Sequence, residues 1–372
     1  MNNSLRLQEE LNKIQFQGAI LTSPESIRYF SGFTSADGLV FVGQGLTALV
    51  TDSRYWAQAE VQCPQVDLIK FQSHIDISLA SALNTYLKYK NFSGKIAIEG
   101  DSLTFDRFTQ LNEELVINGP CTELKSLSSL ISSLRLVKTA EELQAIAKSA
   151  AVADLAWQKT LPSFKEGITE ADLCAELEYQ MQKCGARKPS FDTIVASGLN
   201  GAYPHATVTD RVIQSGELIT VDFGCLVDGW CSDITRTIWL GELDSKSQEI
   251  WQTVRRAHDT ALEAVKPGLQ GCELDKIARD IITGAGYGEY FSHSLGHGVG
   301  LAVHEGPGLR RESMTILTPG MTCTIEPGIY VPGFGGCRIE DLVYVTDNGF
   351  KKLSNAPYQI LGMKHPLEAY TK

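Results

Sequence analysis

The sequence lacks several features that would place it in common functional classes. No stretch has the roughly 18–20 uninterrupted apolar residues that a membrane-spanning helix needs, since even residues 38–50 contain Gln44 and three glycines. Lys and Arg form no run, and 33 of them stand against 44 Asp and Glu, a net charge of −11. We therefore expect no nucleic-acid partner and no membrane partner, whereas carboxylates suit a metal cation.

Disulfide and export signals are also missing. The nine cysteines are dispersed and include no C-x-x-C pair. The first residues, MNNSLRLQEELNK, carry charges where a signal peptide would be apolar. We therefore expect reduced, mostly buried thiols and a cytoplasmic protein.

Several familiar catalytic motifs are missing as well. The sequence contains no G-x-S-x-G elbow, no H-E-x-x-H pair and no phosphate-binding P-loop. The stretch GHGVGLAVHEG is glycine-rich, but its third glycine comes one residue too early for a dinucleotide fingerprint. The chemistry must come from another set of residues.

A length of 372 residues suits two domains. The first part alternates short apolar runs with helical patterns, which predicts a small α/β domain over residues 1–132. Its expected strands are residues 18–21, 39–42, 48–51, 66–71 and 95–98, and its expected helices are residues 1–13, 77–89 and 105–114. A serine-rich stretch, residues 124–136, is expected to connect it to a second domain, residues 133–372.

The second domain begins with a strong helix signal. Thr139 and Glu142 have capping-box spacing, and a helix is expected to about residue 161. Further helices are expected over residues 169–184, 245–265 and 273–285. Residues 288–336 contain eleven glycines among His, Glu, Val and Ile, which favours tightly folded loops and strands.

Two aspartates flank a hairpin signal. Apolar strands run on either side of Asp228-Gly229, and Asp222 and Asp233 lie nearly opposite each other across them. Two carboxylates that close repel unless a proton or a cation lies between them. The alternative, that one of them faces solvent, remains equally open on this pattern alone.

More ligand candidates follow along the chain. Three of the seven histidines fall within twelve residues beside glycines, which favours a metal or substrate site. Glu326 and Glu340 each lie in an apolar strand pattern, where an unpaired acid is costly to bury. Four carboxylates and one imidazole carry more charge than one divalent ion needs, so they indicate two divalent ions. Nearby Cys225, Cys231 and Cys337 are expected to pack as small apolar residues.

Taken together, these motifs resemble the pita-bread (creatinase, aminopeptidase P and prolidase) metallopeptidases, in the branch that cleaves Xaa-Pro bonds. The resemblance covers nearly the whole chain and rests on VDFG, SDITRT, GHGVGLAVHEGP, IEPGIY, RIED, AYPH, YFSGFTSADG and TDSRYWAQAE. It implies an α+β fold: a pita-bread catalytic domain with a curved antiparallel sheet, preceded by a smaller α/β domain of the creatinase/prolidase N-terminal type. It further implies a cytoplasmic homodimer that takes proline-containing peptides as substrates.

The same resemblance implies a ligand set for two metal ions. Asp222 would bind one ion through both of its oxygens, and Asp233 and Glu340 would bridge both ions. His297 and Glu326 would complete the second site. A set rich in carboxylates favours Mn²⁺, with Co²⁺ or Zn²⁺ able to substitute.

The remaining roles are implied in the same way. A water molecule between the metals would be the nucleophile, with Glu326 as its general base. His205 and His304 would hold the scissile carbonyl and stabilise the tetrahedral intermediate. His293 would lie on the proline side of the substrate, and Arg338 would orient the ligand carboxylates.

Several activities stay open at this point. The enzyme would cleave before proline at the amino end of peptides or in dipeptides, and the first is our preference. A dipeptidase needs a group, often basic, for the proline carboxylate; Arg310 and Arg311 are candidates, although two exposed loop arginines are the simpler interpretation. The rivals on this fold are a non-catalytic binding module, which would lack ligands, and a creatinase-like amidino hydrolase, which needs no metals. A methionine aminopeptidase is disfavoured by the amino-terminal domain.

Overall fold

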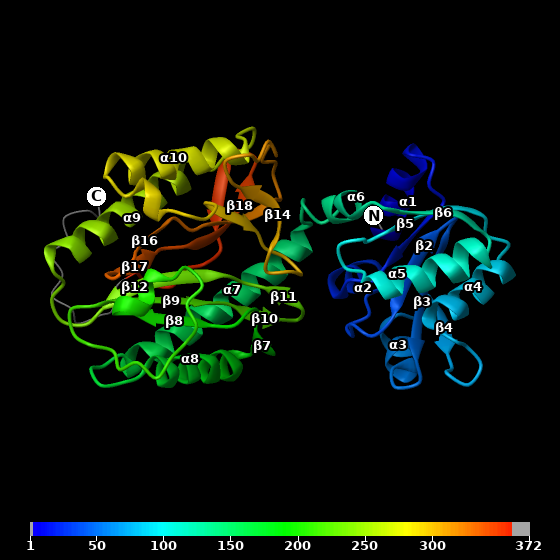
Figure 1. The fold of residues 1–372 in the computed structure, drawn as a ribbon, viewed down its shortest axis with the longest axis horizontal. Helices are drawn as coiled ribbons and strands as arrows, with labels where there is room; N and C mark the ends of the chain where they lie inside the picture. The colour runs from blue at the N-terminus through cyan, green and yellow to red at the C-terminus, as the bar shows by residue number, and fades with distance from the viewer. Residues whose placement is uncertain (1–2, 359–372) are drawn as a thin grey trace. The chain divides into compact units, whose positions relative to one another are not determined.

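The computed structural model describes residues 3–358, which form two compact units. One unit ends at Arg135 and the other begins at Leu136, three residues after the boundary expected from the sequence. Each unit has its own strands and helices (Figure 1). They are described separately below.

The amino-terminal unit is built on one six-stranded mixed sheet, in the order β4-β3-β2-β1-β5-β6. Strands β1 and β2 are buried at every position, so helices cover both of their faces. The strands are β1 (Gly18–Leu21), β2 (Leu39–Gly43), β3 (Leu46–Asp52), β4 (Asp67–Phe71), β5 (Gly94–Ile98) and β6 (Cys121–Ser126). The helices are α1 (Asn3–Lys13), α2 (Pro24–Ser31), α3 (Trp56–Gln62), α4 (Leu79–Tyr89), α5 (Phe105–Asn112), the π-helical η1 (Glu113–Ile117) and α6 (Ser128–Ser133).

The expected connector over residues 124–136 is wrong for most of its length. Strand β6 pairs in parallel with β5 and forms an edge of the sheet, and α6 follows it directly. The leucines and Ile131 explain the difference, because Ile131 is fully buried and anchors this stretch in the amino-terminal unit. The serines with interspersed leucines predicted a connector partly docked on a surface, not a free tether, but most of this stretch forms strand and helix.

Four long helices dominate the second unit: α7 (Ala140–Thr160), α8 (Glu170–Cys184), α9 (Ser245–Ala264) and α10 (Gly271–Gly284). The capping box expected at the start of α7 is confirmed, since the Thr139 side chain accepts from the Glu142 N–H and the Glu142 carboxylate accepts from the Thr139 N–H. A second capping box, Thr169 with Asp172, starts α8. In Figure 1, α7 and α8 run along one side of the strands and α9 and α10 lie on the other side.

The strands of this unit pair antiparallel throughout the described residues. They form several short ladders: β11-β10-β7, β12-β9-β8, β13-β14, β15-β18-β19 and β16-β17. Their bounds are β7 (Lys188–Pro189), β8 (Ile194–Ser197), β9 (Leu218–Phe223), β10 (Cys225–Val227), β11 (Trp230–Cys231), β12 (Ile234–Trp239), β13 (Gly296–Gly298), β14 (Glu305–Leu309), β15 (Thr322–Ile325), β16 (Gly328–Val331), β17 (Gly335–Arg338), β18 (Asp341–Thr346) and β19 (Gly349–Lys352). Short 3₁₀ turns η2 (Leu161–Ser163), η3 (Gly198–Ala202) and η4 (Gly288–Tyr290) connect some of them.

The β9–β12 pair has one apolar and one polar face. Side chains alternate along a strand, so Val221 and Phe223 share a face, and they pack with Trp157 of α7. The opposite face carries Asp222 on β9 and Thr235 on β12, which are direct register partners. This polar face is buried, and it is where the site forms.

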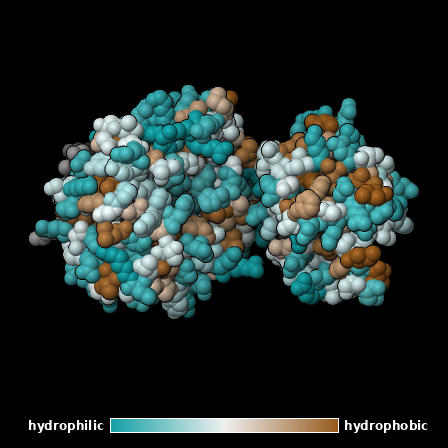
Figure 2. Space-filling model, viewed as in Figure 1, coloured by the Kyte–Doolittle hydropathy of each residue, from teal (hydrophilic) through white to brown (hydrophobic). Residues whose placement is uncertain are grey.

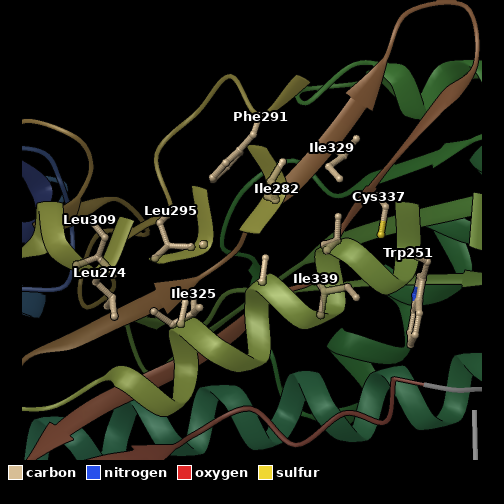
Figure 3. Close-up of a cluster of buried hydrophobic side chains, with 14 of the residues drawn as sticks. Trp251, Leu274, Ile282, Phe291, Leu295, Leu309, Ile325, Ile329, Cys337 and Ile339 are labelled. Carbon is tan, nitrogen blue, oxygen red and sulfur yellow. The ribbon is translucent and has the colours of Figure 1, made fainter. Parts of the chain in front are cut away.

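The second apolar cluster fixes the carboxy-terminal strands against α9 and α10. Figure 3 shows Leu274 and Ile282 of α10 beside Ile325 and Ile339, all of them almost fully buried. These two isoleucines immediately precede Glu326 and Glu340. Packing of the apolar neighbours therefore holds both acids in place.

Among residues 3–358 no helix is both long and apolar enough to cross a membrane. The visible surface of each unit is mainly hydrophilic, with apolar side chains in small separate areas (Figure 2).

Candidate metal centre and substrate pocket

The hairpin at Asp228-Gly229 is present and brings Asp222 and Asp233 together. Both turn residues have positive φ, 48° and 80°, as a tight two-residue turn requires. The register pairs Asp222 with Thr235, so Asp233 lies diagonally across from Asp222 instead of directly opposite. Residues 233 and 235 share a face, and both aspartates therefore point toward the same space.

Glu326 and Glu340 lie in breaks between strands, not inside strands as the sequence pattern suggested. Ile325 pairs with Asp341 and Gly328 pairs with Arg338. Between these two pairs, each chain segment has two residues outside the strand ladders: residues 326 and 327 on one segment and residues 339 and 340 on the other. The physical reason is Pro327, which has no N–H to continue the ladder. The two breaks face each other and turn both carboxylates out of the sheet.

His297 lies on β13 and completes the set. Its Nε2 is 3.2 Å from Glu326 Oε1 and 3.5 Å from Asp233 Oδ2. Its Nδ1 is 3.1 Å from the Gly298 carbonyl and therefore carries the proton. Burial alone would lower the pKa of His297, but its hydrogen bond with Glu326 and the charge of that carboxylate raise it, which favours a second proton on Nε2. A metal ion would take the place of that proton, and Nε2 facing the carboxylates is the arrangement found in metal-binding histidines.

The structure brings all five expected ligands into three overlapping groups. In each group, the potential ligand atoms lie no more than 4.8 Å apart. Asp233, His297 and Glu340 each belong to two of these groups. The groups are Asp222, Asp233 and Glu340; His297, Glu326 and Glu340; and Asp233, His297 and His304.

The buried carboxyls repel one another strongly. Burial, and then the charges of neighbouring carboxylates, raise the pKa of Asp233 and of Glu340 well above the usual range. Burial also acts on Glu326, but its hydrogen bond with His297 and the nearby positive charges outweigh this effect and lower its pKa to about 2. Glu326 is therefore a carboxylate at neutral pH, whereas Asp233 and Glu340 need a cation to stay ionised.

Two buried oxygens point to such a cation. Asp222 Oδ1 and Glu340 Oε1 have no hydrogen-bond partner among residues 3–358. A buried acceptor without a partner is costly. A hard donor set of four carboxylates and one imidazole, with unpartnered oxygens at its centre, fits divalent metal ions.

Arg338 binds the outer side of this cluster. Its Nη2 donates to Asp222 Oδ2 at 2.6 Å, its Nη1 to Tyr330 Oη at 2.6 Å, and its Nε to Thr235 Oγ1 at 3.1 Å. The side chain is almost fully buried. The guanidinium thus orients one ligand directly and a second through Thr235.

A chain of hydrogen bonds extends from Arg338 to His293. The His293 Nδ1 donates to the Ser294 carbonyl at 2.8 Å, and burial lowers the pKa of this imidazole, so its Nε2 is an acceptor. Tyr330 Oη lies 2.9 Å from that Nε2 and donates to it. Both nitrogens of His293 are therefore hydrogen-bonded within the protein. Only the carbon surface of the ring is left to contact a substrate in the pocket.

His205 and His304 are exposed and flank the cluster. The His304 ring packs edge-to-face on the His297 ring, with centroids 4.2 Å apart. Burial, and then the charge of His297, lower the pKa of His304. A neutral, accessible imidazole beside the ligands can donate a hydrogen bond to substrate.

One pocket of about 870 Å³ joins these residues. It is lined by eight of the nine expected site residues, and Glu340 lies behind them. The other wall consists of Cys174 and Glu178 of α8, residues 191–194, and residues 204 and 206–208, with Ser294. Arg310 and Arg311 are exposed, and neither lines this pocket.

The cysteines near the cluster take no part in it. Cys225, Cys231 and Cys337 are buried, and all nine cysteines of the chain are free thiols. Burial raises the pKa of Cys225 and of Cys337 to about 12, so neither is a thiolate.

Sequence reasoning missed three contributors. Thr235 was quoted only as part of a motif, although its place two residues after Asp233 on a strand puts it on the site face. Tyr330 links Arg338 to His293, and no sequence pattern indicated this. The wall from α8 depends on how a helix packs on β8, which a single sequence does not state.

Comparisons with known proteins identify the family of the chain. Residues 144–347 match the model of metallopeptidase family M24, and residues 4–137 match that of the creatinase/prolidase N-terminal domain. The chain is 39% identical over 360 residues to a Xaa-Pro dipeptidase of Pyrococcus furiosus, covering 95% of this chain and 99% of the relative.

Solved structures are similar over nearly the whole chain. A Xaa-Pro dipeptidase from Bacillus anthracis superposes with a TM-score of 0.89 at 38% identity, covering 95% of this chain and 97% of that one. An X-Pro aminopeptidase from Thermotoga maritima gives 0.87 at 32% identity, covering 97% and 99%. The α+β architecture expected from the sequence is confirmed, and the chain belongs to metallopeptidase family M24, with a creatinase/prolidase N-terminal domain before its catalytic part.

Proposed function

We propose that the protein is a Xaa-Pro peptidase that hydrolyses the bond before proline with two divalent metal ions. The observation that carries this proposal is the convergence of four carboxylates and His297 at the base of a pocket with accessible imidazoles. Relatives named Xaa-Pro dipeptidase and X-Pro aminopeptidase support the choice of substrate.

In this proposal the five clustered side chains are the metal ligands. Asp222 would hold one ion, Asp233 and Glu340 would be shared by both, and His297 and Glu326 would complete the second. The group of Asp222, Asp233 and Glu340 and the group of His297, Glu326 and Glu340 support this division, since Glu340 belongs to both. The unpartnered Asp222 Oδ1 and Glu340 Oε1 supply two of the donor atoms.

Two bound divalent ions would lower the pKa of a water molecule between them and polarise the substrate carbonyl. Glu326 would accept the proton of the attacking water, because its carboxylate lies in the pocket wall beside the other ligands. Arg338 keeps Asp222 in place through its 2.6 Å hydrogen bond while the substrate reacts.

The histidines act on the substrate. His205 and His304 donate hydrogen bonds to the scissile carbonyl and then to the oxyanion, for which their exposed rings are suited. His293 contributes the surface of its ring on the proline side, because both of its nitrogens are occupied.

Our proposals for the native metal, the oligomeric state and the location rest on the sequence. We propose Mn²⁺ as the native metal, with Co²⁺ and Zn²⁺ as substitutes, since the donors are mostly hard oxygens. A homodimer and a cytoplasmic location complete the proposal. A non-catalytic binding module would be expected to lack ligands, and a creatinase-like hydrolase would not need them, so neither is favoured by this cluster.

We propose that the enzyme prefers peptides longer than two residues. A dipeptidase needs a group to hold the proline carboxylate, and Arg310 and Arg311 do not line the pocket. The lining cation Arg338 is engaged by Asp222, Tyr330 and Thr235. The pocket wall thus offers no free side-chain cation among its lining residues.

Activity against a small peptide panel tests this function. We expect Mn²⁺-dependent cleavage of Xaa-Pro tripeptides and little cleavage of matched Xaa-Ala tripeptides, measured by release of the first residue. If the enzyme hydrolysed Xaa-Pro dipeptides and not the tripeptides, the proposed preference for longer peptides would be wrong. Absence of all Xaa-Pro cleavage with metal bound would sink the function itself.

Replacing a bridging ligand tests the metal assignment. Asp233→Ala should abolish activity and metal occupancy, because it removes a carboxylate shared by two ligand groups, while the amino-terminal unit stays folded. Asp192→Ala, which removes an exposed carboxylate from the same pocket wall, should keep its metal. Metal content by mass spectrometry after dialysis against Mn²⁺ is the measurement, and equal loss in both variants contradicts the assignment.

Replacing His304 separates catalysis from metal binding. His304→Ala should lower kcat by about 10²–10³-fold, the usual effect of losing one oxyanion donor, and should keep the metal content of the wild type. Steady-state kinetics with a Xaa-Pro tripeptide give the first result. Wild-type turnover would refute the donor role, and loss of metal would make His304 a ligand.

A further inference from the structure

We propose that Thr235 is a positioning residue that orients the Glu340 carboxylate for metal binding. The proposal rests on the metal site described above, not on the identity of the peptide substrate. The SDITRT segment carries two buried threonines, Thr235 and Thr237, and only Thr235 lies between Arg338 and Glu340.

The direction of the hydrogen bonds at Thr235 is determined by Arg338. The Nε of Arg338 has a proton and no lone pair, so it donates to Thr235 Oγ1 at 3.1 Å. The hydroxyl proton then goes to Glu340 Oε2, 2.7 Å away. Thr235 is completely buried, so no water competes for either bond.

This arrangement distinguishes the two oxygens of Glu340. Oε2 is occupied by the Thr235 hydroxyl, whereas Oε1 has no partner among residues 3–358. A rotation of the carboxylate would break the bond to Oε2 and leave the threonine proton unpaired in the interior, which is costly. Thr235 therefore holds Glu340 in the orientation that presents Oε1 to the cluster.

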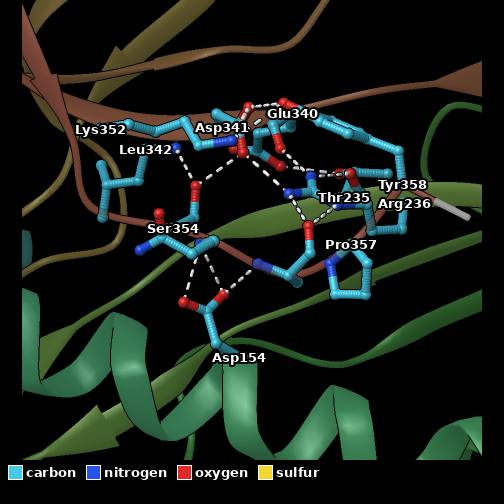
Figure 4. A network of polar contacts seen from close by, with 12 residues as sticks. Asp154, Thr235, Arg236, Glu340, Asp341, Leu342, Lys352, Ser354, Pro357 and Tyr358 are labelled. Atoms are coloured by element: carbon cyan, nitrogen blue, oxygen red, sulfur yellow. Dashed lines mark hydrogen bonds and ion pairs between the residues drawn. The ribbon is translucent and has the colours of Figure 1, made fainter. Parts of the chain in front are cut away.

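The backbone fixes the distance between the two residues. The Glu340 N–H donates to the Thr235 carbonyl at 3.1 Å. Arg236 Nη1 donates to both the Thr235 carbonyl, at 2.9 Å, and the Glu340 carbonyl, at 2.5 Å. Figure 4 shows this buried guanidinium between β12 and the segment that carries Glu340.

Arg236 is itself anchored on its other side. Its Nη2 donates to Asp341 Oδ1 at 2.8 Å, and Asp341 also accepts from Ser354 Oγ at 2.8 Å. Both ionic side chains are inaccessible to solvent. The pair therefore holds the main chain at residues 340 and 341, and the Thr235 hydroxyl restrains the side chain of Glu340 at its carboxylate.

Thr237 provides a matched control two residues along the same strand. It is also buried and also bonds to Arg338: its Oγ1 donates to the Arg338 carbonyl at 2.6 Å and accepts from the Arg338 N–H at 3.1 Å. Its hydroxyl lies 3.0 Å from Thr220 Oγ1 and, within residues 3–358, donates to no ligand carboxylate. A general loss of packing or polarity affects both threonines, whereas only Thr235 contacts Glu340.

The experiment compares Mn²⁺ affinity by isothermal titration calorimetry on the full chain after chelator treatment. Thr235→Val should weaken binding by about 10–100-fold, the usual effect of losing an outer partner of a ligand. Thr235→Ser, which keeps the hydroxyl, should bind close to the wild type. Thr237→Val should lower the melting temperature and keep the wild-type affinity.

Two results would overturn the proposal: wild-type affinity in Thr235→Val, or equal weakening in Thr237→Val. If the valine variant does not fold, Thr235→Ala repeats the comparison with the hydroxyl removed. Because metal affinity is measured without peptide, failure of the wild type to cleave Xaa-Pro bonds leaves this test intact.

Discussion

The central physical constraint in this protein is the burial of four carboxyl groups in one small space. Asp233 and Glu340 are buried, and Asp222 and Glu326 are largely so. Burial, and then the charges of the neighbouring carboxylates, raise the pKa of Asp233 and Glu340 well above the usual range. A fold can keep such a cluster only if protons or cations compensate its charge. Arg338 supplies one charge from outside, and divalent ions would supply the rest from within.

The rest of the catalytic unit makes that cluster geometrically stable. A diagonal pair on β9 and β12 contributes the aspartates, and two facing strand breaks contribute the glutamates. Apolar residues beside the acids, Ile325 and Ile339, are packed against α9 and α10. Arg236 and Asp341 tie the strands together behind the site. The acids are therefore held by packing and by hydrogen bonds to their outer oxygens, which leaves inner oxygens free.

Much of this could be predicted from the sequence, because the decisive signals are local. The Asp-Gly turn, the capping box at Thr139 and the alternation along β9 and β12 each depend on a few neighbouring residues, and the structure contains all three. The family resemblance added the order of the ligands. Helix α2 was missed, although Ser23 before Pro24 and Gly32 after the last turn are helix-end signals. Contacts between distant segments, such as Tyr330 with His293 or α8 with the pocket, could not be predicted, because no local pattern specifies them.

The proposed chemistry depends on two divalent ions held by the five clustered side chains. Anomalous X-ray diffraction from crystals grown with Mn²⁺ would locate these ions. We expect two anomalous peaks roughly 3.5–4 Å apart, each in contact with oxygens of Asp233 and Glu340. No peak at this cluster, or manganese bound only elsewhere on the chain, would contradict it.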